Sequence, residues 1–68
     1  MTIDRERIDQ YARRRFDARE LLTWQIDDVE NVVVFFVPTG VSVIGFPKEL
    51  GGARVVTRTL PRPIAEVQ

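Results

Sequence analysis

The chain of 68 residues contains no cysteine and no histidine. Without cysteine no disulfide can stabilise a small domain, and without both residue types the common zinc sites are excluded. The commonest general base and the strongest side-chain nucleophile are missing as well. We therefore expect no cofactor and no metal, and we predict that the protein is not an enzyme.

The chain also lacks a long hydrophobic run. The longest uninterrupted apolar segment is residues 32–37, far shorter than the roughly 20 residues of a membrane-spanning helix. Acidic and basic residues mix at the N-terminus, where a signal peptide would need a continuous apolar stretch. These absences lead us to expect a soluble cytoplasmic protein without a membrane partner.

Neither sign of charge dominates, because ten Lys and Arg residues balance ten Asp and Glu residues. A neutral chain has no strong overall field that would attract nucleic acid. The one dense basic cluster, Arg13 to Arg15, spreads around a helix at about 100° per residue, and Asp9 can neutralise part of it. We interpret these arginines as a solvated helix surface and keep phosphate binding as the alternative. The residues of that alternative site are Arg13, Arg14, Arg15, Arg54 and Arg58.

Three acidic residues, Asp27, Asp28 and Glu30, lie close together in a polar segment. Carboxylates bind hard cations such as calcium and magnesium, but the spacing and the glycine of an EF-hand loop are missing. We interpret the cluster as a solvated turn rather than a metal site.

A helix is predicted over residues 4–20, with Thr2 or Asp4 as its N-cap. Apolar side chains recur there at helical spacing and form the stripe of an amphipathic helix. The stripe consists of Ile8, Tyr11, Ala12 and Phe16.

The rest of the chain has the alternation and the turn residues of β-structure. Residues 38–40, Pro-Thr-Gly, have the composition of a hairpin turn, so we expect the flanking segments to pair as antiparallel neighbours. Two arginines place the last strand at a sheet edge, and residues 61–68 are expected to form a loose tail or an arm. The predicted strands are residues 22–26, 32–37, 41–46 and 54–60.

These elements predict one α+β domain over residues 1–68. One N-terminal amphipathic helix packs on a small antiparallel β-meander of three to four strands. The order of elements is too generic to indicate a family.

Residues 32–37 read Val-Val-Val-Phe-Phe-Val and do not alternate with polar residues. Such a strand is typical of a sheet that is buried on both faces. The helix can cover one face, but a chain this small has little left to cover the other. We therefore expect a second copy of the chain to cover it. The predicted homo-oligomer interface consists of Val33, Phe35, Val37, Ile44 and Phe46.

The predicted function is that of a small non-enzymatic interaction or regulatory module. Its partner is itself, as a dimer or a higher oligomer, with another protein as a further partner. Two alternatives stay open: a nucleic-acid binder that uses the arginines named above, and a ligand binder or enzyme with a site between subunits.

Overall fold

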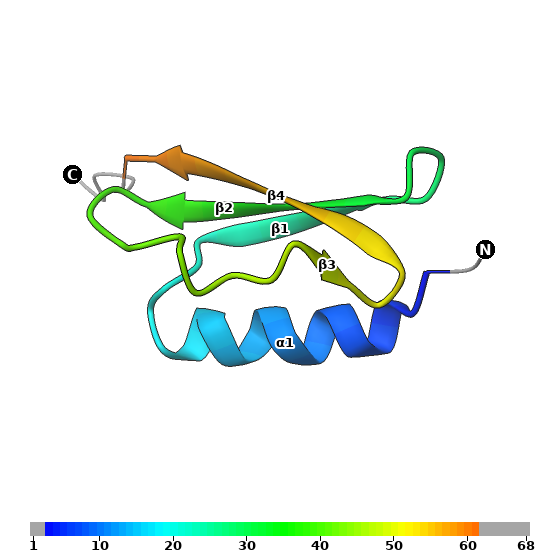
Figure 1. The fold of residues 1–68 in the computed structure, drawn as a ribbon. Helices are drawn as coiled ribbons and strands as arrows, with labels where there is room; N and C mark the ends of the chain where they lie inside the picture. The colour runs from blue at the N-terminus through cyan, green and yellow to red at the C-terminus, as the bar shows by residue number, and fades with distance from the viewer. Residues whose placement is uncertain (1–2, 62–68) are drawn as a thin grey trace, which may run out of the picture.

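The structure is a computed structural model, and it describes residues 3–61. The N-terminal helix lies along one face of a sheet (Figure 1), so the α+β class and the position of the helix are confirmed. The elements are α1 (Arg5–Asp17), β1 (Thr23–Asp27), β2 (Val32–Pro38), β3 (Glu49–Leu50) and β4 (Ala53–Leu60). The predicted tail lies outside the described residues from residue 62 onward.

The sheet is mixed, so the prediction of a purely antiparallel meander is wrong. Its strand order is β1-β2-β4-β3, in which β1 pairs with β2 and β3 with β4 in the antiparallel sense. The two central strands, β2 and β4, are parallel. Parallel neighbours need a crossover connection, and the chain from residue 39 to residue 48 supplies it by returning on the helix side of the sheet (Figure 1).

Residues 41–46 form this connection and not the returning strand that we predicted. The Val41 N–H donates to the Pro38 carbonyl at 3.2 Å, and the Phe46 N–H donates to the Val43 carbonyl at 3.2 Å. These local turns replace a ladder with β2. Ile44 is 90% exposed, whereas Phe46 is buried, so the segment is fastened to the core mainly through one aromatic side chain.

Both ends of α1 are capped by local hydrogen bonds. The Asp4 carboxylate accepts from the Arg7 N–H at 3.1 Å, which confirms one of the two predicted N-caps. At the other end the Arg19 N–H donates to the Phe16 carbonyl and the Glu20 N–H to the Arg15 carbonyl. This is a Schellman motif, and it requires a left-handed residue, here Arg19 at φ 64°.

The hydrophobic core lies between α1 and the sheet. Six of its side chains have no exposed surface: Ile8, Ala12, Val33, Phe35, Val37 and Ala53. Tyr11, Phe35 and Phe46 pack against one another with ring centroids 5.6 to 6.1 Å apart. Within the described residues, no helix has the length and apolar character needed to cross a membrane.

Candidate interaction surface

The residues predicted to contact a second copy lie in the chain's own core, with one exception. Val33, Phe35 and Val37 have no exposed surface, and Phe46 is 8% exposed. These four side chains pack between the sheet and α1, so they are not part of the surface of the single chain. Ile44 is exposed in the crossover connection, away from the strands.

The opposite face of the sheet presents three rows of side chains. Residues paired across neighbouring strands point to the same face, so the register of the strands defines each row. The rows are Asp27–Val32–Arg54–Glu49, Gln25–Val34–Val56 and Thr23–Phe36–Arg58. We call these ten residues the open face.

The centre of the open face is apolar and its two sides are polar. Val32, Val34 and Phe36 on β2, with Val56 on β4, are half-buried by their neighbours. The three open-face residues of β1 are exposed, and so are both arginines of β4. Among residues 3–61, the helix lies on the other side of the sheet (Figure 1), so no helix covers these apolar side chains.

The local fold holds Asp27 in place at one corner of the open face. One of its carboxylate oxygens accepts from the backbone N–H groups of Val29 and Glu30, at 3.0 and 3.1 Å. This Asx turn closes the β1–β2 hairpin. The other carboxylate oxygen makes no hydrogen bond within residues 3–61, so it is available to a cation on a facing surface.

The five arginines of the alternative site are divided among three places. Arg13 and Arg14 are exposed on α1, while Arg54 and Arg58 belong to the open face on the far side of the sheet. Arg15 is occupied by contacts within the chain. This separation leaves a common phosphate-binding patch without geometric support.

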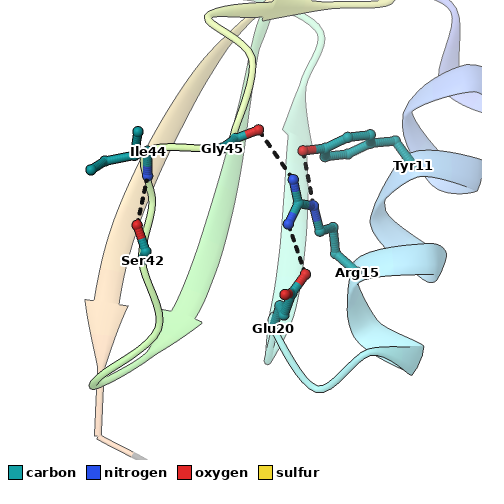
Figure 2. A network of polar contacts seen from close by, with 6 residues as sticks. All are labelled: Tyr11, Arg15, Glu20, Ser42, Ile44 and Gly45. Carbon is teal, nitrogen blue, oxygen red and sulfur yellow. Dashed lines mark hydrogen bonds and ion pairs between the residues drawn. The ribbon is translucent and has the colours of Figure 1, made fainter.

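Arg15 fastens the crossover connection to the helix, as Figure 2 shows. Its guanidinium donates to the Tyr11 hydroxyl at 3.1 Å, to the Glu20 carboxylate at 2.7 Å and to the Gly45 carbonyl at 3.1 Å. It also lies over the Phe46 ring, 4.7 Å from its centroid. The hydrogen bond to Glu20 raises the pKa of Arg15 above its ordinary value, although partial burial opposes this. Arg15 is therefore a structural residue that stays charged.

Gly45 explains why this contact forms. A Cβ at Gly45 would lie 3.3 Å from the nearest Arg15 nitrogen, tighter than most packed carbon contacts. The absence of a side chain at Gly45 leaves room for the Arg15 guanidinium to reach the Gly45 carbonyl.

The acidic turn residues make contacts within the chain. Asp28 forms an ion pair with Arg5 at the start of α1, and both side chains are more than half exposed, so the pair contributes little. Within residues 3–61 no three His, Cys, Asp or Glu side chains gather as metal ligands do. A surface hollow of about 620 Å³ borders this turn and reaches Val34 on the open face.

The aromatic side chains are split between the two faces of the sheet. Phe36 belongs to the open face, while Phe35 and Phe46 lie in the core. Trp24 is on the helix side, where its indole N–H donates to Asp9 at 3.1 Å. The open face therefore has one aromatic ring within an aliphatic row, which is a surface suited to packing against apolar side chains.

No family model, curated protein or solved structure matches this chain.

Proposed function

We propose that this protein is a small, non-enzymatic interaction module that self-associates through the open face of its sheet. The observation that carries the proposal is the row of half-exposed apolar side chains on β2, which no helix covers in residues 3–61. A cytoplasmic location belongs to the proposal on the composition alone, since the chain has no cysteine.

The apolar row supplies the driving force for association. Contiguous apolar surface on a sheet face marks an interaction site, and burial contributes roughly 25 cal/mol per Å². Complete burial of a Val or Phe side chain contributes about 1.5–3 kcal/mol, and these side chains are already half-buried in the single chain. Each copy therefore gains only part of that amount. Because association itself costs at least about 4 kcal/mol, we expect a weak, concentration-dependent dimer.

The charges beside the row favour a second copy as the occupant. Asp27 stands on the β1 side of the apolar row. Arg54 and Arg58 stand on the β4 side, and Glu49 of β3 lies beyond Arg54, so this side keeps a net positive charge. A surface with opposite charges on its two sides can complement itself when two copies meet across a two-fold axis. The same surface then serves both partners.

The test is the oligomeric state of two matched variants. Val34→Asp places a charge at the centre of the open face, and Ile44→Asp places one at an exposed position outside it. In sedimentation equilibrium over a range of concentrations, we expect wild type and I44D to dimerise and V34D to remain monomeric with an unchanged circular dichroism spectrum. A wild-type protein that stays monomeric at millimolar concentration would contradict the proposal.

A further inference from the structure

We infer that the two copies pack about a two-fold axis parallel to β2, so that Asp27 of one copy faces Arg54 of the partner subunit. This inference rests on the self-association proposed above. It goes beyond that proposal because it fixes which residues meet and how the two sheets are oriented.

The register of the strands places Asp27 and Arg54 at the same position along the strand direction. Asp27, Val32, Arg54 and Glu49 form one row across the sheet. Asp27 and Arg54 lie one strand away from Val32 on either side, and Glu49 lies one strand beyond Arg54. Neighbouring strands lie about 4.8 Å apart. A two-fold axis that runs parallel to β2 between two facing sheets places the β1 side of one sheet over the β4 side of the other. Each residue keeps its position along the strand direction. This axis therefore places each Asp27 over the other copy's Arg54.

The same operation matches the remaining rows. Val34 meets Val34 of the partner subunit at the axis, which buries the centre of the apolar row. Thr23 faces Arg58 of the partner subunit, so its hydroxyl can accept a hydrogen bond from that guanidinium. Sheets that pack face to face keep their strands within about 30° of each other, and this axis satisfies that geometry.

The other aligned arrangement brings like charges together. A two-fold axis perpendicular to the strands places the β4 side of one sheet over the β4 side of the other and reverses the strand direction. Arg54 then faces Arg58 of the partner subunit. Two such arginine pairs repel in the dimer. Asp27 then faces Thr23 of the partner subunit. Neither arginine faces an acidic residue of the partner subunit, and Glu49 lies beside Arg54 within its own chain. The charges of the open face therefore select the first axis.

Charge reversal tests the inference in a way that separates contacts between copies from contacts within one copy. Arg54→Glu creates two repulsive contacts with Asp27 in its homodimer, and Asp27→Lys creates two with Arg54. Mixing the two variants yields a heterodimer with one native contact and one contact between the introduced charges of opposite sign. If Asp27 and Arg54 instead interacted within one chain, mixing the variants would not strengthen association, because each chain would still hold two side chains of like charge.

We expect each variant alone to dimerise about tenfold more weakly than wild type in low-salt buffer, and the equimolar mixture to recover most of the loss. Sedimentation equilibrium gives the three dissociation constants. R58E is the matched control, since it carries the same substitution at the other end of β4 and should gain nothing from D27K.

Asp27 also closes the hairpin, so D27K is checked by circular dichroism. If it loses structure, D27N replaces it, because asparagine keeps the acceptor oxygen of the turn. Its mixture with R54E has one native and one neutral contact, and should associate more tightly than R54E alone.

Two results would overturn the inference while leaving self-association intact. In the first, R54E dimerises more tightly than wild type, as the axis across the strands requires. In the second, wild type dimerises but mixing recovers nothing. A monomeric wild type would instead remove the proposed function, and the inference with it.

Discussion

Gly51 and Asp4 join the start of the helix to the turn between β3 and β4. The Asp4 N–H donates to the Gly51 carbonyl at 2.8 Å, and a Cβ on Gly51 would lie 2.8 Å from the Asp4 carbonyl oxygen. The helix and the sheet are thus held together by backbone at the end opposite to the Arg15 contacts. No side chain larger than hydrogen fits between them without displacement.

The first prediction concerns this contact. Gly51→Ala adds a Cβ at φ 59° that also meets the Asp4 backbone, so we expect a loss of about 2–3 kcal/mol in the free energy of unfolding. Gly40→Ala is the control, because Gly40 has φ 95° but open space around it. Its loss should be about 1 kcal/mol in urea titrations. Equal losses would show that the backbone conformation, and not the contact, decides the effect.

The second prediction is a stabilising substitution at the end of α1. Arg19 adopts a left-handed conformation at φ 64°, which costs a side-chain-bearing residue energy that glycine does not lose. Arg19→Gly should therefore raise the unfolding free energy by about 0.5–1 kcal/mol. Ala18→Gly, at φ −81°, should give no gain. Thermal unfolding of both variants checks the difference.

The third prediction compares two adjacent phenylalanines. Phe35 has no exposed surface, and Phe36 lies on the open face. Phe35→Ala should cost about 3–5 kcal/mol, enough to unfold a domain of this size, whereas Phe36→Ala should cost about 1 kcal/mol in dilute solution. Circular dichroism with urea titration distinguishes them. Comparable losses would mean that the two faces of β2 are equally covered in the single chain.

The fourth prediction concerns the hold of Arg15 on the crossover connection. Lysine keeps the charge but cannot donate to Tyr11, Glu20 and Gly45 at once, so Arg15→Lys should cost about 1–2 kcal/mol. The connection should also open more often. Thermolysin, which cleaves before large apolar residues, should then cleave before Ile44 faster in R15K than in wild type. Arg14→Lys, on the exposed side of the helix, should change neither measurement.

The side chains of β2 alternate between its two faces, and the set that we assigned to a partner from the sequence is the set that packs against the helix. The two sets are nearly equal in size, since one holds Val33, Phe35 and Val37 and the other holds Val32, Val34 and Phe36. Neighbouring strands decide between them. β1 places Trp24 opposite Phe35 and Ile26 opposite Val33, so the apolar side of β1 and the helix lie on the same face.

That decision depends on the length of the turn after β1. A shift of one residue would move every side chain of β1 to the other face, and the polar composition of residues 27–31 does not fix the register. The open face therefore could not be identified from the sequence. The alternation along β2 gives two sets of side chains, and either set could have formed the face away from the helix.

The parallel pairing of β2 with β4 could not be predicted from the sequence pattern either. Pro38, Thr39 and Gly40 do form a turn, as predicted, and Gly40 takes its positive φ. The turn directs the chain to the helix side of the sheet, however, because Phe46 finds its place there against Tyr11 and Phe35. Residues 41–46 therefore pack through Phe46 against the core and do not form a strand beside β2.

The parallel pairing has a consequence for the order in which the molecule is made. Val33 lies beside Val55, so the central pair of strands joins residues 22 positions apart and must close a long loop before the β2–β4 ladder can grow. A nascent chain that has emerged from the ribosome only as far as the crossover connection holds α1, β1 and β2 with one side of β2 unpaired. The fold is completed after β4 has emerged, and until then its most apolar strand has an unpaired edge that can pair with another chain.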